Sequence, residues 1–338
     1  MPLIVQGVGP VHADPISWSE PRDARSRQAD SLGRDAFRGH LDIGLVNNMP
    51  DGAVRATERQ FARLLAVASG PTDVRLHLFA LPDIPRGAET RAYLDARYRD
   101  AAALEGVRLD ALIVTGTEPI ANTLVGEPYW PSLTRMVDWA EHNTVSTLWS
   151  CLAAHAAVFH LDGVTRRRLP DKRFGLFECV KVAPDGLLDG APPGMRVPHS
   201  RWNDLEEGDL RSHGYRIVSR SLEAGIDTFT KQWASLFVFL QGHPEYDVDS
   251  LFREYRRDAQ RYLQGERDGL PALPAHYFDA KTESRLALFQ DRAESRDPGA
   301  LEAFPREWAI RPALVALWRA SSSQLYRNWL TQIAAAKR

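Results

Sequence analysis

Short apolar runs alternate with segments of helical periodicity through the first half of the chain. Runs rich in β-branched and apolar residues, bounded by turn residues, are typical of buried strands, whereas apolar residues at helical spacing are typical of helices that cover a sheet. This alternation predicts a parallel sheet with crossover helices, which is an α/β fold. The predicted strands are residues 41–46, 74–81, 109–115 and 144–150, and the predicted helices are residues 57–68, 91–105, 131–142 and 152–162.

The second half of the chain predicts antiparallel additions and further helices. The pattern around residues 215–219 indicates an antiparallel strand, and residues 228–240 contain two more strand-like runs. A helix is expected from about residue 248 to residue 263, and another over residues 313–335. The stretch from residue 265 to residue 311 is rich in proline and charge, so we expect it to be irregular.

Composition limits the partners and the compartment of this protein. The 338 residues carry a formal net charge of −2 with both signs mixed, which gives no field for nucleic acid or a membrane surface. The longest apolar runs, such as residues 233–240, are too short to span a bilayer, and no signal peptide is evident. Two cysteines make no disulfide framework in a chain of this length. We therefore expect a cytoplasmic enzyme that acts on small molecules. The composition is compatible with a homodimer.

Cys151 stands where a predicted strand turns into a predicted helix. Residues 144–150 before it are mostly β-branched or apolar, the Ala-rich segment after it has helical spacing, and Gly163 is a suitable stop. Such a junction can lift a nucleophile out of the backbone, and a helix N-terminus favours a thiolate. The alternative is packing, because free cysteine is among the most buried residue types. Packing is our prediction for Cys179, which lies in an alternating strand pattern.

His243 and Glu245 follow the last predicted strand and supply the partners that a cysteine nucleophile needs. They are two residues apart, so in extended backbone their side chains leave the same face. The thiol requires a base for its proton, and the imidazole requires a carboxylate to fix its tautomer. We therefore predict that Cys151, His243 and Glu245 form a catalytic triad at one rim of the sheet. The alternative is a surface turn fixed by Pro244.

Arginine side chains near these strand ends are candidates for substrate binding. Arg201 follows a short strand, and its planar fork suits a carboxylate, although pairing with a surface acid is an equal alternative. Arg253 and Arg257 lie four residues apart on one face of a predicted helix, with Arg256 beside them. An arginine of this helix that points toward the rim would hold a substrate carboxylate.

No metal or nucleotide cofactor is predicted. His155 and His160 lie near Cys151, but a separation of five residues does not place both on one helical face, and no carboxylate is in register for zinc. The chain has neither a Walker loop nor a Gly-x-Gly-x-x-Gly pattern. The chemistry is therefore expected to rest on side chains and on the substrates themselves.

Several segments, taken together in their order and spacing, resemble the homoserine O-succinyltransferase family of methionine biosynthesis. No single segment is specific, but the combination is. The resemblance covers residues 41–260, and near the C-terminus it includes only residues 277–278 and 325–330. The matching segments are Asn48-Met49-Pro50, Thr57-Glu58 with Gln60-Phe61, residues 112–116, Tyr129-Trp130-Pro131, residues 146–163, Pro198-His199-Ser200-Arg201 and residues 242–247.

The resemblance implies a class I glutamine-amidotransferase-like (flavodoxin-like) fold. This fold has a doubly wound, mainly parallel sheet, here with small antiparallel additions and a C-terminal helical extension. On this basis residues 1–40 would form an N-terminal arm, residues 41–265 the catalytic domain, and residues 266–338 an extension packed on the same domain. Residues 1–40 are rich in Pro, Asp, Arg and Ser without periodicity, which is typical of an arm and not of a core element.

The resemblance also implies a ping-pong acyl transfer from succinyl-CoA or acetyl-CoA to the hydroxyl of homoserine, with no other cofactor. Cys151 would attack the thioester and keep the acyl group, while His243 acts as base and Glu245 orients His243. The family's substrate-binding positions fall at Lys172, Ser200, Arg201 and Arg257, and the N–H groups of its oxyanion hole at Gly116, Thr117 and Leu152.

Departures from the family pattern leave the substrate open. The family usually has Thr-Gly-Ala-Pro where residues 115–120 are Thr-Gly-Thr-Glu-Pro-Ile, and this loop helps the family to choose succinyl over acetyl. Leu152 replaces the usual tryptophan, and an insertion lies around residues 280–310. The alternatives are acylation of another hydroxy amino acid such as serine, a glutamine-amidotransferase-like hydrolase, and a binding protein that kept the fold. The complete set of Cys, His and Glu argues against the last.

Overall fold

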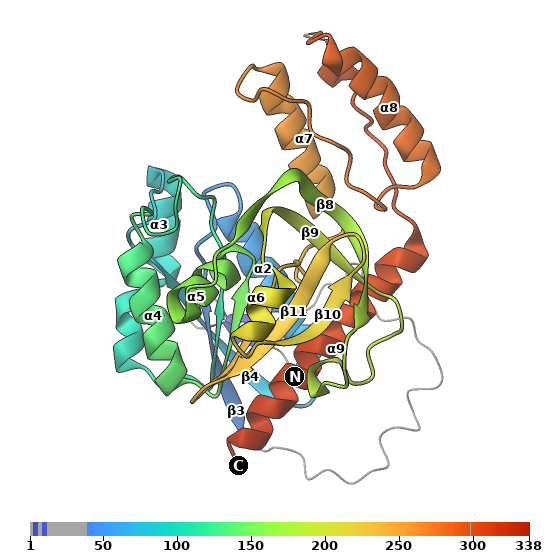
Figure 1. The fold of residues 1–338 in the computed structure, drawn as a ribbon. Helices are drawn as coiled ribbons and strands as arrows, with labels where there is room; N and C mark the ends of the chain where they lie inside the picture. The colour runs from blue at the N-terminus through green and yellow to red at the C-terminus, as the bar shows by residue number, and fades with distance from the viewer. Residues whose placement is uncertain (1–2, 6–8, 12–38, 298) are drawn as a thin grey trace.

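The sheet has a parallel centre in a doubly wound order (Figure 1). The computed structural model describes residues 3–5, 9–11, 39–297 and 299–338. After β3 the chain adds β4 on one side of that strand, and it later adds β6 and β7 on the other side. The strand order therefore reverses between β3 and β6. In α/β sheets, ligands bind beyond the carboxyl ends of the strands at such a reversal. The central strands run parallel in the order β4 (Asp73–Ala80), β3 (His40–Val46), β6 (Ala111–Val114), β7 (Ser146–Ser150) and β12 (Leu236–Leu240).

Further strands extend the sheet at both edges. Beyond β12, antiparallel pairing continues through β11 (Gly225–Gln232), β10 (Arg216–Ser221), β8 (Arg167–Lys181) and β9 (Met195–Asp204). Beyond β4 lie β1 (Leu3–Val5), β2 (Gly9–Val11) and the short β5 (Arg99–Asp100). The predicted doubly wound, mainly parallel sheet with antiparallel additions is confirmed.

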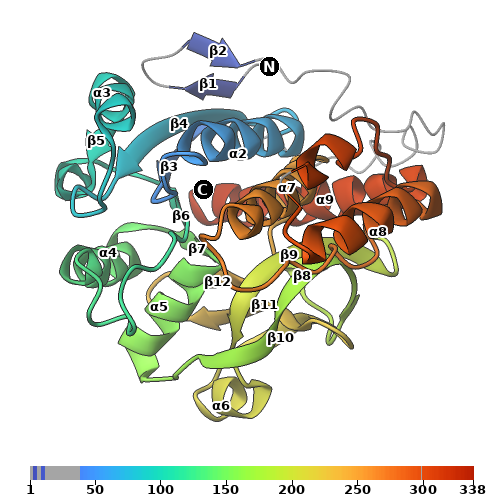
Figure 2. The same ribbon diagram turned by 90° about the horizontal axis from the view of Figure 1, so that it is seen from above.

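Helices cover both faces of the sheet (Figure 2). Alternate residues of the central strands face opposite sides, so Ile113 belongs to one apolar core and Leu112 to the other. The first core is covered by α2 (Val54–Ala68) and α9 (Pro312–Ala336), and the second by α4 (Trp130–Asn143) and α5 (Leu152–Asp162). The remaining helices are α3 (Ala88–Arg97), α6 (Glu207–Ser212), α7 (Ser250–Leu263), α8 (Ala280–Glu294), and the 3₁₀ helices η2 (Ala101–Gly106), η3 (Gly186–Leu188) and η4 (Ala300–Ala303). Among the described residues, no helix combines the length and apolar character that crossing a bilayer requires.

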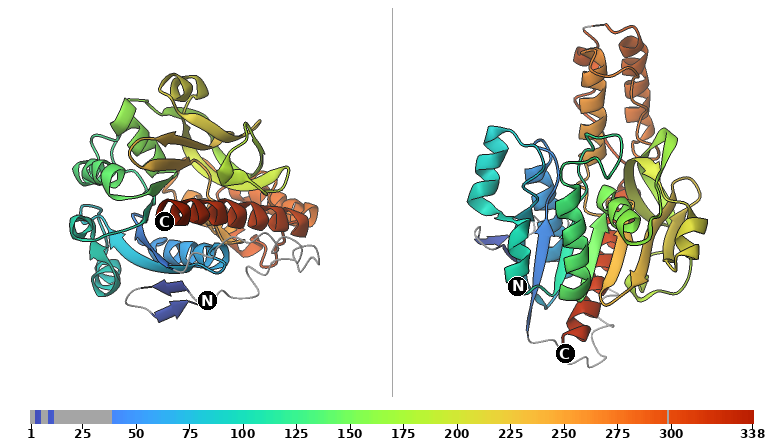
Figure 3. Two further views of the ribbon diagram at one scale, coloured as in Figure 1. Left: turned by 90° about the horizontal axis from the view of Figure 1, so that it is seen from below. Right: turned by 60° about the vertical axis from the view of Figure 1, so that its left-hand side comes forward.

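A helix occupies the region that we expected to be irregular. α8 begins after Asp279, whose carboxylate accepts a hydrogen bond from the backbone N–H of Thr282 at 2.8 Å. Its Leu286 and Phe289 join an apolar cluster with α7, and the two helices stand side by side away from the sheet (Figure 3). The prediction for residues 265–311 is therefore wrong in its centre, because the charged residues lie on the outer face of an amphipathic helix.

The helix predicted over residues 91–105 is shorter than expected. α3 ends at Arg97, and Tyr98 has an extended backbone with φ −109° and ψ 151°. The Tyr98 hydroxyl donates to Glu58 of α2 at 2.9 Å and accepts from Asn47 at 3.1 Å. These tertiary contacts hold Tyr98 outside the helix, so the chain continues as β5 and then η2.

Part of the segment predicted as an N-terminal arm contributes to the sheet. β1 pairs in parallel with β4, and its Leu3 and Val5 are buried in the core. This part is therefore a core element, because an apolar strand of three residues can pair with the edge of the sheet without any longer periodic pattern. Residues 12–38 of the predicted arm lie outside the described residues.

Candidate active site

Cys151 occupies a strained turn between β7 and α5, at the junction that the sequence predicts. Its φ of 53° and ψ of −113° lie in a region that residues with a Cβ rarely adopt. The N–H of Cys151 donates to the carbonyl of Leu240 on β12 at 2.7 Å, which fixes the turn to the neighbouring strand. The side chain is partly exposed and lines a pocket at the carboxyl ends of the strands. This geometry is that of a nucleophile elbow.

His243 and Glu245 lie next to Cys151 because their strands are neighbours. β7 and β12 pair in parallel with Ser150 opposite Leu240, so both chains leave the sheet at the same rim. Nδ1 of His243 lies 2.9 Å from Oε1 of Glu245, and His243 and Cys151 line the same pocket and interact electrostatically. The structure thus brings the three residues of the predicted triad together at one pocket.

The surroundings of His243 favour its charged form. Burial lowers the pKa of the imidazole, but the charge of Glu245, the interaction with Cys151 and the hydrogen bond to Glu245 raise it more, so the pKa of His243 is held well above its usual value. The ring of Tyr246 stacks on the imidazole with the centroids 4.3 Å apart. Within the described part of the chain, Oε2 of the buried Glu245 has no hydrogen-bond partner. The neighbouring Glu245 carboxylate therefore favours the imidazolium form of His243.

The loop after β6 and the start of α5 both contribute residues to the pocket. Gly116, Thr117 and Leu152, the residues of the predicted oxyanion hole, all line it. Gly116 approaches the start of α5 so closely that a Cβ at this position would lie 2.9 Å from Cβ of Leu152. Asn48 fixes the loop, because its backbone N–H donates to Oγ1 of Thr115 at 2.8 Å. Only glycine lets this loop meet the helix N-terminus without displacing it.

The predicted substrate residues Lys172, Ser200 and Arg257 line the same pocket, whose volume is about 280 Å³. Two of them converge on Glu254 of α7, an acidic residue that the sequence analysis missed. Ser200 Oγ donates to the Glu254 carboxylate at 2.5 Å, and Lys172 Nζ donates at 3.4 Å. The Tyr246 hydroxyl donates to the other oxygen at 2.7 Å. Glu254 precedes Arg257 by three residues, so the helical spacing that brings Arg257 to the rim could also have found Glu254.

Arg201 does not line the pocket, which corrects its predicted role. It follows Ser200 on β9, and successive side chains of a strand point to opposite faces. Its buried guanidinium donates to Asp204 at 2.8 Å, to the carbonyl of Asn203 at 2.7 Å and to the carbonyl of Ala224. The Arg201 fork is occupied inside the protein and is not presented to a substrate carboxylate.

The two histidines near Cys151 bind side chains away from it. His155 Nε2 lies 2.8 Å from the side-chain oxygen of Gln241, and His160 Nε2 lies 2.7 Å from Asp138. Burial, the largest of several influences, lowers the pKa of His155 to about 3, so this imidazole is neutral. Each of the two histidines therefore has a side-chain partner other than Cys151.

A cluster of Cys, His and Asp is buried beside Gly242, at the start of the loop that carries His243 and Glu245. Ligand atoms of Cys179, His199 and Asp227 all lie within 4.8 Å of one another. Nδ1 of His199 accepts a long hydrogen bond from Nε of Arg201 at 3.4 Å, so the imidazole hydrogen is on Nε2, where a metal would need a lone pair. Burial raises the pKa of the Cys179 thiol well above its usual value. The cluster fits a hydrogen-bonded core better than a metal site.

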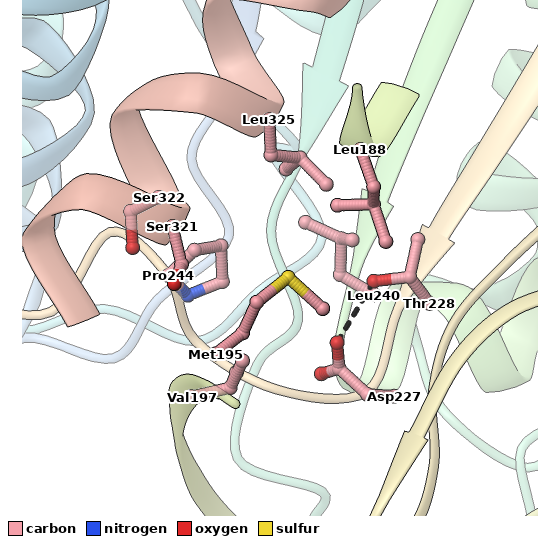
Figure 4. Close-up of a pocket in the computed structure, with 10 residues that line it drawn as sticks. All are labelled: Leu188, Met195, Val197, Asp227, Thr228, Leu240, Pro244, Ser321, Ser322 and Leu325. Carbon is pink, nitrogen blue, oxygen red and sulfur yellow. Dashed lines mark hydrogen bonds between the residues drawn. The ribbon is translucent and has the colours of Figure 1, made fainter. Parts of the chain in front are cut away.

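The C-terminal helix α9 contacts the loop of residues 241–247, which carries His243 and Glu245. Trp318 Nε1 of α9 donates to the carbonyl of Pro244 at 3.4 Å. A cavity of about 20 Å³, enough for one water molecule, lies beside this contact. Figure 4 shows the residues that line it, namely Pro244, Leu240, Asp227, Thr228, Met195, Val197 and Leu188 with Ser321, Ser322 and Leu325 of α9. α9 is therefore part of the frame that positions His243 and Glu245.

The sequence matches a known protein family along almost its whole length. A model of the family described as homoserine O-succinyltransferase matches residues 28–337. A homoserine O-succinyltransferase of Rhodopseudomonas palustris is 48% identical over 336 residues, which are 99% of this chain and 99% of that protein. One of Bradyrhizobium japonicum is 48% identical over 306 residues, which are 90% of this chain and 93% of that protein. Among solved structures, a glutamine amidotransferase of Methylobacillus flagellatus is similar with a TM-score of 0.46 and 15% identity, covering 87% of this chain and 94% of that chain.

Proposed function

The chain belongs to the homoserine O-succinyltransferase family, and from this premise we propose that it transfers a succinyl group from succinyl-CoA to the hydroxyl of L-homoserine through an acyl-enzyme on Cys151. The observation that supports this proposal most is the grouping of Cys151, His243 and Glu245 at one pocket, with the imidazole hydrogen-bonded to the carboxylate. The partners would be small molecules, with no cofactor besides the CoA thioester. The product would serve methionine biosynthesis in the cytoplasm.

The first step forms the acyl-enzyme. The Cys151 thiolate, paired with the His243 imidazolium, attacks the thioester carbonyl, and the bond between that carbon and the CoA sulfur breaks. His243 gives its proton to the departing CoA thiolate. The N–H groups of Leu152 and of the Gly116 loop would hold the negative oxygen of the tetrahedral intermediate.

The second step discharges the acyl group. Once the thiolate has become a thioester its negative charge is gone, so one of the influences that raise the pKa of His243 disappears. The neutral imidazole then takes the proton of the homoserine hydroxyl, and the resulting oxygen attacks the acyl carbon as Cys151 leaves as a thiolate. Proton and charge return to their starting positions, which makes the pair ready for another donor.

The charges of the pocket suit an acceptor that is an amino acid. Arg257 and Glu254 lie on one face of α7 and both line the pocket, so a cation and an anion face the same space. We infer that Arg257 binds the homoserine carboxylate and that Glu254, assisted by Tyr246 and Ser200, binds its ammonium group. Lys172 is held at Glu254 and Asp258 and would balance their charge before the acceptor enters.

The direct test is intact-mass spectrometry of the protein mixed with succinyl-CoA in the absence of an acceptor. We expect an adduct with the mass of one succinyl group, located on Cys151 by peptide mapping and released as O-succinylhomoserine when L-homoserine is added. Acetyl-CoA as donor and serine as acceptor are run in parallel. An adduct with acetyl-CoA alone, or release by serine alone, would contradict the proposal. Glutamine hydrolysis without any adduct would favour an amidotransferase-like hydrolase.

Replacing Glu245 by glutamine should change the pH dependence of acylation. Glutamine keeps the size of the side chain but removes the charge that raises the pKa of His243, so the pKa of His243 falls and fewer molecules carry the imidazolium at neutral pH. The acylation rate should fall on the alkaline side as His243 loses its proton. Since the pKa of His243 is raised in the native protein and lower in Glu245→Gln, this alkaline limb should move to lower pH in the variant. The rate at neutral pH should fall by roughly 10- to 100-fold.

The measurement is the rate of adduct formation in single turnovers across a pH series. Glu105→Gln, which removes an exposed carboxylate outside the pocket, is the matched control and should leave the profile unchanged. A Glu245→Gln profile that keeps both the position of its alkaline limb and its height would show that Glu245 does not act on His243.

A further inference from the structure

Arg261 lines the pocket of Cys151 but is held only loosely there. It lies on α7, one turn after Arg257, and its ion pair is with Glu118 at 3.7 Å, longer than a hydrogen bond. The side chain of Arg261 is 43% exposed and that of Glu118 57% exposed. A pair of this length and exposure contributes little to stability and separates at little cost.

The other cations of the pocket that the structure describes are bound more closely. Arg257 forms a hydrogen bond to Asp258 at 2.9 Å, and Arg267 contacts the same carboxylate at 3.4 Å. Lys172 lies 3.4 Å from Glu254 and 3.5 Å from Asp258. Arg261 is therefore the pocket cation that can most easily exchange its carboxylate for one that a ligand brings.

The position of Glu118 indicates which part of the ligand Arg261 would meet. Glu118 follows Gly116 by two residues, and Gly116 contacts Leu152, the residue after the nucleophile. The loop of Glu118 thus borders the space into which an acyl group on Cys151 extends. A succinyl group carries its free carboxylate three carbon–carbon bonds beyond the thioester carbonyl, which would bring it toward this loop.

We propose that Arg261 selects a dicarboxylic acyl donor by releasing Glu118 and binding the distal carboxylate of the succinyl group. Glu118 holds the place of that carboxylate while the pocket is empty and turns to water when the donor enters, so one negative charge replaces another. The planar guanidinium can bind the carboxylate through two parallel hydrogen bonds. This inference rests on the proposed function. It identifies Arg261 as the residue that would make the protein prefer a succinyl donor.

The test compares two donors that differ in the distal carboxylate. Acyl-enzyme formation is measured by intact mass in single turnovers with succinyl-CoA and with butyryl-CoA, for the native protein and for Arg261→Met. We expect the ratio of kcat/KM for succinyl-CoA to that for butyryl-CoA to fall by about tenfold or more in Arg261→Met, with the rate for butyryl-CoA unchanged. Arg261→Lys, which keeps the charge but not the fork, should lie between the two.

Two further variants complete the design. Glu118→Gln removes the competing carboxylate and should lower KM for succinyl-CoA without changing KM for butyryl-CoA. Arg253→Met removes an arginine from the same helix that is 54% exposed, pairs with Asp249 and lies outside the pocket lining, and it should behave like the native protein.

Other outcomes separate this inference from the proposed function. An equal loss with both donors in Arg261→Met would overturn the inference, because Arg261 would then bind the phosphate groups of CoA and not the acyl carboxylate. Unchanged rates with both donors would overturn it as well. If the native protein forms no adduct with either donor, the proposed function itself fails, and that result is independent of Arg261.

Discussion

Replacing Cys151 by alanine should abolish both the acyl-enzyme and the overall transfer. In the proposed mechanism the sulfur forms the covalent bond to the acyl group, and alanine offers no atom that can take its place, so the rate should fall by roughly 10⁴-fold or more. Alanine keeps the Cβ that the turn already accommodates at a φ of 53°, so the fold should survive. The measurements are intact mass after mixing with succinyl-CoA and the release of free CoA in the presence of homoserine.

The other cysteine provides the matched control. Cys179 is buried and its thiol has a raised pKa, so Cys179→Ala should still form the adduct at a near-native rate. An adduct that persists in Cys151→Ala, or that disappears in Cys179→Ala while the protein stays folded, would assign the nucleophile to a different residue.

Replacing His243 by alanine should slow both half-reactions. In the proposed mechanism the imidazolium would supply the proton that CoA takes, and the neutral imidazole would later remove the proton of the acceptor hydroxyl. A general acid and base of this kind contributes about 10²- to 10⁴-fold, and we expect the rates of acylation and of acyl transfer each to fall within that range. Single-turnover adduct formation and its decay with homoserine report the two steps separately.

Added imidazole gives a second readout for His243→Ala. The variant leaves a space the size of the ring next to Tyr246, so free imidazole should restore part of the rate in proportion to its concentration. His142→Ala, at an exposed position on α4 away from the pocket, should need no rescue. Acylation within threefold of the native rate in His243→Ala would exclude the role that we assign to this residue.

The central sheet and the elbow could be predicted because their signals are local. Each buried strand is a short apolar run, and Cys151 stands between such a run and an Ala-rich helix that ends at Gly163. His243 and Glu245 follow another apolar run, and the rule that parallel strands end at one rim joins them to the cysteine. The positions of Cys151, His243 and Glu245 are set by the strand that precedes each of them, and the details of the antiparallel region do not affect them.

The errors occurred where contacts between distant segments decide the conformation. The register of β9 turns Arg201 inward and Ser200 to the pocket, and a sequence of polar residues does not reveal that register. Tyr98 leaves the helical conformation because its hydroxyl meets Glu58 of α2. The apolar residues of α8 are interspersed with charged residues in the sequence, so its periodicity is weak. Its packing on α7 determines which face is buried. Glu254 was missed because most acidic residues on a helix are solvated.

Because β7 pairs with β12, the proposed reacting residues of the pocket come from different segments than the residues proposed to bind the substrate. Cys151 and His243, the proposed nucleophile and base, follow the ends of two adjacent strands, whereas the intervening chain forms the antiparallel strands that carry Lys172 and Ser200. Changes in that intervening chain, in α7 or in the Glu118 loop can therefore alter the substrate while the spacing between Cys151 and His243 stays fixed by the sheet. In this architecture the positions of the proposed reacting residues are fixed, whereas the segments that would bind the substrate can vary. Substitutions in those segments can therefore change the substrate specificity without altering the proposed reaction.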